Sequence, residues 1–204
     1  MFHPRFVGLC KLVHLVSLAL WGGGASFFSY LTTPKIFSHL RDQLPLSPLP
    51  GVQGLTAEVG RRLAGDVVGT IFPIYFTFQA ITGVLAVAAG VLLARHGQRL
   101  DKIRCGLVAV ALGLVLFHVA TVYPRSVRIL DESYQAQDGG DSRNAEELRK
   151  TFGMWHGVSQ LLNFMTIALV IAALVLASLT LRDPSRSVDP VRPLGLMTGR
   201  VRGV

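Results

Sequence analysis

Charged residues are unevenly distributed along this chain, and they leave long apolar blocks between them. Four blocks without a charged side chain cover residues 12–34, 67–94, 105–124 and 151–181, and each holds at least 20 residues. A helix rises about 1.5 Å per residue, so each block is long enough to cross the roughly 30 Å hydrocarbon core of a bilayer. The pattern predicts four transmembrane helices and an all-α, integral membrane four-helix bundle within residues 1–181.

Composition and charge agree with a multi-pass membrane protein. Of the 204 residues, 50% are hydrophobic and 16% are charged, and the mean hydropathy is +0.48. These values argue against an ordinary soluble domain. The formal net charge of +8 does not indicate nucleic acid, because the basic side chains stand beside apolar spans, where they set topology and contact anionic headgroups. We expect the lipid bilayer as partner and no nucleic acid, and the sequence leaves the oligomeric state open.

The basic residues also predict an orientation. The shortest connection between spans, residues 95–104, holds four basic side chains. Short basic connections stay on the cytoplasmic side of a membrane. The pattern therefore predicts that this loop and both termini are cytoplasmic. The basic tail at residues 182–204 contains three prolines, and we expect it to be disordered and to contact anionic headgroups.

The two outer connections differ in their predicted structure. The first contains three prolines within residues 45–50, which favour a surface loop, and Thr56 can then cap a short helix that leads into the second span. The second continues the third span as a helix, breaks at Gly139 and Gly140, and resumes as a polar helix from about Ser142. In that helix Glu146 and Lys150 stand four residues apart and are expected to pair.

Small residues recur at spacings of three, four or seven within two of the spans. They are Gly83, Ala86 and Gly90 in the second span and Gly106 and Gly113 in the third. Such spacing lets helix backbones approach closely, because packing rather than water exclusion holds helices together in lipid. The pattern predicts close helix contacts at all five positions.

Polar residues inside the spans predict where the bundle interior lies. In the fourth span they recur at intervals of three and four residues: His156, Ser159, Gln160, Asn163 and Thr166. This spacing puts them on one face of a helix, while aliphatic residues occupy the other faces. A polar group in the hydrocarbon layer must face a partner, a cavity or the interface. We expect this face to point into the bundle.

Counting residues from the centre of each span gives the depth of these groups. His118, Asn163 and Thr77 come out at one level, about 5 Å to the outer side of the midplane. His156 lies closer to the outer interface. The sequence therefore predicts an outward-biased polar pocket that is lined by Thr77, His118, Gln160 and Asn163 and covered by His156.

Several interpretations of these polar groups are open. They stabilise packing by bonding one another across helices, or they form a pocket that binds or moves a small solute or a metal ion. A third interpretation is a haem-dependent membrane oxidoreductase, with His14 or the pair His118 and His156 as ligands. By the same count His14 lies about 12 Å to the inner side of the midplane. A fourth is a ligand-free membrane scaffold.

An enzyme is not the favoured interpretation. The four spans contain no Asp or Glu, and the carboxylates outside them stand among basic residues. The sequence therefore offers no nucleophile with a base and an orienting group. We assign no catalytic residue and favour a binding role for the pocket.

Four stretches of the chain resemble a known family. They are KLVHLVSLALWGGG at Lys11–Gly24, IFPIYF at Ile71–Phe76, VYPR at Val122–Arg125 and FGMWHGVSQLLNF at Phe152–Phe164. On these stretches the chain resembles the transmembrane protein 205-like family, also called domain of unknown function 4149. The resemblance implies a four-helix integral membrane protein and names no reaction.

The first of these stretches has a second, fainter resemblance. Its basic residue, His14, Trp21 and glycines are similar to the HemJ-type protoporphyrinogen oxidases and to the copper-resistance D membrane proteins. In the HemJ-type enzymes the position that matches His14 is a haem ligand. This resemblance implies haem as the cofactor of the oxidoreductase alternative.

Overall fold

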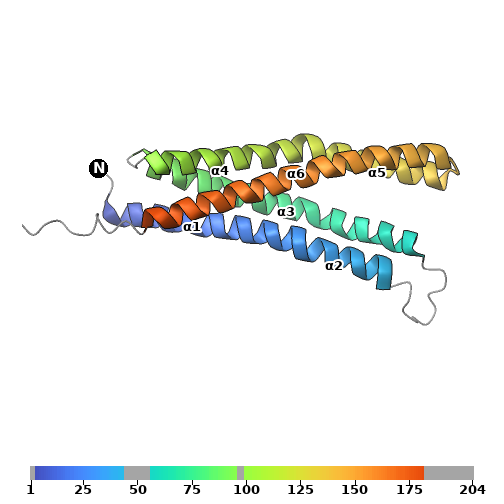
Figure 1. Cartoon of the computed structure of the whole chain (residues 1–204), viewed down its shortest axis with the longest axis horizontal. Helices are drawn as coiled ribbons and strands as arrows, with labels where there is room; N and C mark the ends of the chain where they lie inside the picture. The colour runs from blue at the N-terminus through green and yellow to red at the C-terminus, as the bar shows by residue number, and fades with distance from the viewer. Residues whose placement is uncertain (1–2, 44–55, 96–98, 182–204) are drawn as a thin grey trace, which may run out of the picture.

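The structure, a computed structural model, describes residues 3–43, 56–95 and 99–181. These residues form four long helical rods that run along one common axis (Figure 1). The first rod comprises α1 (Pro4–Phe27), η1 (Phe28–Thr32), α2 (Thr33–Phe37) and η2 (Ser38–Gln43). The second rod is α3 (Ala57–Ala94), and the fourth is α6 (Ser142–Leu181). The third rod comprises α4 (Arg99–Phe117), η4 (His118–Val122) and α5 (Tyr123–Asp138). Each rod has the length and the apolar composition of a membrane span. The predicted all-α membrane four-helix bundle is confirmed.

The rods extend beyond the predicted spans mainly at one end of the bundle, although the first and third rods also start earlier than predicted at the other end. They contain 38 to 40 residues each, which corresponds to about 57–60 Å of helix, nearly twice the thickness of the hydrocarbon layer. Most of the additional turns lie where the first and third rods end and the second and fourth begin, and these turns carry most of the charged side chains. We call this the projecting end, and the opposite end, where the described chain starts and finishes, the tail end.

The helix boundaries at the projecting end follow the predicted signals. The hydroxyl of Thr56 accepts a hydrogen bond from the Val59 amide at 3.3 Å, and α3 starts at the next residue. Gly140 adopts a φ of 82°, which favours glycine, and α6 follows from Ser142. The ammonium of Lys150 lies 2.8 Å from the Glu146 carboxylate. The predicted cap, break and ion pair are confirmed, while the loop at residues 45–50 lies outside the described residues.

The basic connection at the tail end is shorter than predicted. Helix α4 begins at Arg99, so the expected loop is helical from that residue onward. Arg104 is buried and pairs with Asp101 at 3.1 Å instead of extending towards headgroups. Residues 96–98 and the tail at 182–204 lie outside the described residues. The orientation of the termini stays a prediction.

Helices pack closely in the tail-end half of the bundle, where α1 contacts α3 and α6, and α4 contacts α3 and α6. Among the described residues Leu18, Trp21, Ala86, Val108 and Ala173 are fully buried there. Small side chains and one indole ring therefore fill the space between four helices that lie close together.

Glycines explain part of this close approach. A Cβ built on Gly83 would lie 2.9 Å from side-chain atoms of Trp21 and Leu112, and a Cβ on Gly90 would lie 3.1 Å from the His14 ring. The predicted close contacts are confirmed at these two positions. They are wrong at Gly106 and Gly113, where a Cβ would meet no atom within 4 Å, because these two glycines lie on the exposed side of α4.

Wide helical turns interrupt the first rod at η1 and the third rod at η4. In η1 the Thr33 amide donates to the Phe28 carbonyl, and in η4 the Tyr123 amide donates to the His118 carbonyl, each five residues back. A proline follows directly in both rods. Proline has no amide hydrogen, and in an α-helix its ring collides with the carbonyl four residues earlier. The wider turn accommodates the proline without breaking the rod.

Candidate functional site

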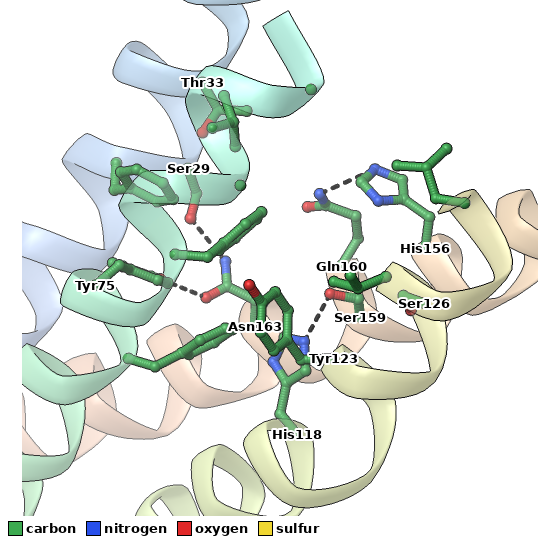
Figure 2. Close-up of a pocket in the computed structure, with 18 of the residues that line it drawn as sticks. Ser29, Thr33, Tyr75, His118, Tyr123, Ser126, His156, Ser159, Gln160 and Asn163 are labelled. Carbon is green, nitrogen blue, oxygen red and sulfur yellow. Dashed lines mark hydrogen bonds between the residues drawn. The ribbon is translucent and has the colours of Figure 1, made fainter. Parts of the chain in front are cut away.

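A cavity of about 160 Å³ lies in the projecting half of the bundle. Here α5 packs on α6, and η2 and α2 pack on α3, so the four rods form two pairs with the cavity between them. All four rods contribute side chains (Figure 2). Most of the wall is apolar or aromatic, and the polar lining residues are Ser29, Thr33, Tyr75, His118, Tyr123, Ser126, His156, Ser159, Gln160 and Asn163.

Helix α6 contributes four polar residues to one wall of the cavity. The hydroxyl of Ser159 and Nε2 of His118 share a hydrogen bond of 2.7 Å, which joins α6 to η4. One turn nearer the projecting end, the Gln160 amide nitrogen lies 3.3 Å from Nε2 of His156. His118 is buried, whereas His156 and Gln160 are exposed. The two histidines thus define a buried end and an open end of one polar wall (Figure 2).

Asn163 closes the floor of the cavity by joining three rods. The Tyr75 hydroxyl donates to its amide oxygen at 2.8 Å, and its amide nitrogen donates to the Ser29 hydroxyl at 2.8 Å (Figure 2). These bonds satisfy both ends of the carboxamide and fix its orientation. Phe28, which precedes Ser29, stacks on the Tyr75 ring with 4.3 Å between the ring centroids. The floor is therefore a packed layer that separates the cavity from the tail-end core.

Ion pairs hold the helices together at the projecting end, beyond the cavity. Arg62 of α3 pairs with Asp138 of α5 at 2.8 Å, and Arg149 of α6 pairs with Glu58 of α3 at 2.7 Å. The Arg62 guanidinium also lies 4.5 Å from the ring centroid of Tyr134. The hydrogen bond from Arg62 holds the pKa of the Asp138 carboxyl below its usual value. These contacts link the two helix pairs and fix the width of the cavity.

Four of the five residues predicted for the pocket line this cavity: His118, His156, Gln160 and Asn163. Thr77 does not line it. Its side chain is exposed and donates back to the Pro73 carbonyl at 2.8 Å within α3. Depth places Thr77 at the right level, but the cavity face of α3 passes through Tyr75 and Phe76, and the next residue points away from it. Whether the four lining residues bind a ligand is a separate question.

His14 occupies a different part of the bundle. It is 1% exposed, its Nδ1 shares a 2.8 Å hydrogen bond with the Ala86 carbonyl, and its ring lies against Gly90. It belongs to the tail-end core and not to the cavity that His118 and His156 line. Sequence depth alone already separates His14 from the other two histidines, and the structure agrees with that separation.

The histidines of the cavity do not fit a bis-histidine haem. Nε2 of His118 is bonded to Ser159, and Nε2 of His156 is bonded to Gln160, so each ligating atom already has a partner on α6. A cavity of about 160 Å³ is close to the 150 Å³ of an engineered cavity that takes up benzene, and a porphyrin is several times larger. We derive no haem chemistry from this site.

A metal ion has no complete set of ligands in the described part of the chain. Within residues 3–43, 56–95 and 99–181, no three His, Cys, Asp or Glu side chains come together in a way that could hold one. The cavity itself contributes two imidazoles and no carboxylate or thiol from its described lining. Structural and catalytic zinc sites in proteins use three or four protein ligands.

Several lining residues were not identified from the sequence. The aromatic residues Phe28, Phe72, Tyr75, Phe76 and Tyr123 line the cavity, and Ser29 completes the floor. Two signals were available: aromatic residues at spacings of three and four in IFPIYF, and the prolines that follow both wide turns. Ser29 lies in η1 and His118 lies in η4, and both side chains line the cavity.

Comparison with known proteins gives a family for this chain. Residues 16–135 match the family described as domain of unknown function DUF4149. The match starts in α1 and ends in α5, so it contains most of the first three rods and more than half of the chain. A search of curated proteins and a search of solved structures each found no match. The chain belongs to the DUF4149 family.

Proposed function

We propose that this protein binds a small uncharged molecule inside the membrane, in the cavity of its projecting half. The observation that carries this proposal is the cavity itself, which all four rods line with an apolar wall and one neutral polar wall. Ligand sites in proteins commonly combine these two features, because the apolar wall supplies binding energy and a few polar groups fix orientation.

The cavity favours binding over a purely structural role for these polar groups. Protein interiors are close-packed and contain few voids larger than a water molecule. A space of about 160 Å³ exceeds the share of one water, about 30 Å³, several-fold. Polar groups that only join helices need no such space, and the bond of Trp21 to Gln79 in the tail-end core is an example.

The alternatives have less support. A metal-transport role lacks ligands among the described residues, and the oxidoreductase alternative lacks a site that fits haem. A ligand-free scaffold is an outcome of the experiment below. Membership of the transmembrane protein 205-like group, which rests on the four sequence stretches, is part of the proposal and adds no activity to it.

Gly69 provides a direct test of binding. It lines the cavity, and a Cβ built on it would meet no atom within 4 Å. The Gly69→Leu substitution therefore fills the cavity without a backbone clash. Gly113→Leu is the matched control, because a Cβ at Gly113 also meets no atom within 4 Å but lies on the exposed face of α4.

The experiment compares molecules that co-purify with the full-length protein. Wild type and the two variants are purified in detergent and washed, and their organic extracts are analysed by mass spectrometry. We expect a small molecule that wild type and Gly113→Leu retain equally and that Gly69→Leu loses at least about fivefold. Identical extracts from all three proteins would contradict binding in the cavity and favour the scaffold.

The cytoplasmic position of both termini is also part of this proposal. It rests on the basic residues at the tail end, including Arg95, Arg99 and Lys102. A protease-cleavable tag after Val204 should be digested in inside-out vesicles and protected in right-side-out vesicles. The reverse pattern would place the projecting end in the cytoplasm.

A further inference from the structure

We infer that the ligand is a quinone-type lipid whose ring occupies the cavity and whose apolar tail leaves the bundle between α2 and α6. The inference rests on the proposed function and names the class of ligand. It concerns binding of the ring and includes no electron transfer.

The walls of the cavity favour a flat ring. Seven of the lining residues are aromatic: Phe28, Phe37, Phe72, Tyr75, Phe76, Tyr123 and Phe152. They are arranged around one another, with Phe76 stacked on Phe72 at 5.5 Å and edge-on to Tyr123 at 5.2 Å between ring centroids. Aromatic pairs prefer such offset-stacked and edge-to-face arrangements over a face-to-face sandwich. A planar ring can join this arrangement.

The size of the cavity limits what enters it. About 160 Å³ is close to the volume of a cavity that holds benzene, so one six-membered ring with small substituents fits and a long chain does not. A ligand with a tail must therefore extend out of the cavity.

The polar wall favours carbonyl groups on the ring and excludes a charged ligand. Its groups are hydroxyls, imidazoles and carboxamides, and the described lining contains no charged side chain to pair with a phosphate or carboxylate. Ser159 and His118 lie at the buried end of the wall, and the Gln160 carboxamide points into the cavity nearer the open end (Figure 2). Two carbonyls on opposite edges of one ring can accept hydrogen bonds from these two places.

We place the opening of the cavity between α2 and α6. Ser29 and Asn163 join the first rod to α6 at the floor, but beyond that point α2 does not pack on α6 as α1 does. Thr33 on one side and the exposed Gln160 on the other line the cavity at this gap. Tyr30 and Phe164, next along the same helices, are 57% and 60% exposed. A tail that leaves here meets the apolar surface that these helices present to the bilayer.

Thermal unfolding of the full-length protein in lipid nanodiscs tests this inference. The probe is decylplastoquinone, a dimethyl-benzoquinone with a ten-carbon tail. Decylbenzene has the same tail and a ring without carbonyls, and decanol has the tail without a ring. We expect saturable stabilisation by the quinone, about 5 °C at a hundredfold excess over its Kd, and an effect at least threefold smaller with the other two compounds.

Two variants locate the effect. Gly69→Leu should abolish the stabilisation by the quinone, whereas Gly113→Leu should retain it in full. Gln160→Leu should weaken quinone binding about tenfold and leave the small effect of decylbenzene unchanged. Equal stabilisation by decylbenzene, or a quinone effect that survives in Gly69→Leu, would overturn the inference.

The outcome separates this inference from the function on which it rests. One outcome is that Gly69→Leu loses a co-purifying molecule while decylplastoquinone stabilises neither wild type nor any variant. In that case the cavity binds a different class of ligand, and only the inference fails. If the extracts are identical as well, the proposed function fails with it. If decylplastoquinone stabilises wild type and Gly113→Leu but not Gly69→Leu, both the inference and the proposed function are supported.

Discussion

The two halves of the bundle use the same kinds of residue for different purposes. His14 in the tail-end half and His118 in the projecting half are both buried, at 1% and 6% exposure. His14 bonds a backbone carbonyl beneath a glycine, in a core without room for anything else. His118 bonds Ser159 at the edge of a cavity. A buried histidine in a membrane helix is therefore not by itself a sign of a site, and the space beside it distinguishes the two cases.

The halves also differ in how they are held together. Four helices pack directly on one another in the tail-end half, and glycine or alanine permits the close approach. In the projecting half two helix pairs are joined by a floor at Asn163 and by ion pairs such as Arg62 with Asp138. Two wide turns before prolines lie at the transition between the halves. Direct packing leaves no space between the helices of the tail-end half. In the projecting half, the helices are joined at the floor and at the ion pairs, and the cavity lies between these two sets of contacts.

The largest expected effect comes from adding the same side chain to each half. Gly83→Leu forces atoms against Trp21 and Leu112 and should destabilise the protein by about 3 kcal/mol, because the tail-end core has no room. Gly69→Leu enters the cavity and should change stability by less than about 1 kcal/mol in the absence of ligand. Thermal unfolding in detergent measures both. Equal destabilisation by the two substitutions would contradict the contrast between the halves.

Removing one amide from each half gives a smaller and more selective effect. Gln79→Leu leaves the buried Trp21 indole without its acceptor, and Asn163→Leu removes two bonds from the floor, so each should cost about 1–2 kcal/mol. Only Asn163→Leu should also reduce retention of the co-purifying molecule. If Gln79→Leu, destabilised to the same extent as Asn163→Leu, also lost that molecule, the floor would not separate the two halves.

The smallest effect concerns the ion pairs at the projecting end, outside the predicted spans. Arg62 lowers the pKa of Asp138 in the folded protein below its ordinary value of 3.8, so this pair contributes stability above pH 3.8. That contribution should be lost as the pH falls through the lowered pKa. Asp138→Asn should remove this part of the pH dependence of the unfolding temperature between neutral pH and pH values below 3.8. Identical acid profiles for wild type and variant would show that the pair does not join the helix pairs.

The fold could be predicted from the sequence because membrane spans depend on one property, the absence of charge over a sufficient length. The four blocks at residues 12–34, 67–94, 105–124 and 151–181 all lie within long helices. The helix ends at Thr56 and Gly140 could be predicted for a similarly local reason, a side-chain cap and a backbone angle. Local rules of this kind do not require knowledge of neighbouring helices.

The site could be predicted only in part, because depth is one coordinate and rotation about the helix axis is another. Depth correctly grouped His118 with Asn163, but it also grouped them with Thr77, which faces away from the cavity. Gly106 and Gly113 have helical spacing but no facing helix. The rotation of each helix depends on which side its neighbours cover, and the wide turns at η1 and η4 change it within a rod. A single sequence does not contain that information in a local form.

Native mass spectrometry of the intact protein tests the central claim, that the cavity of the projecting half holds a small uncharged molecule. Wild type and Gly113→Leu, released gently from detergent, should each carry one additional mass per chain, and Gly69→Leu should appear at the mass of the bare chain. The same bare mass for all three proteins, or the same added mass on Gly69→Leu, would contradict the account.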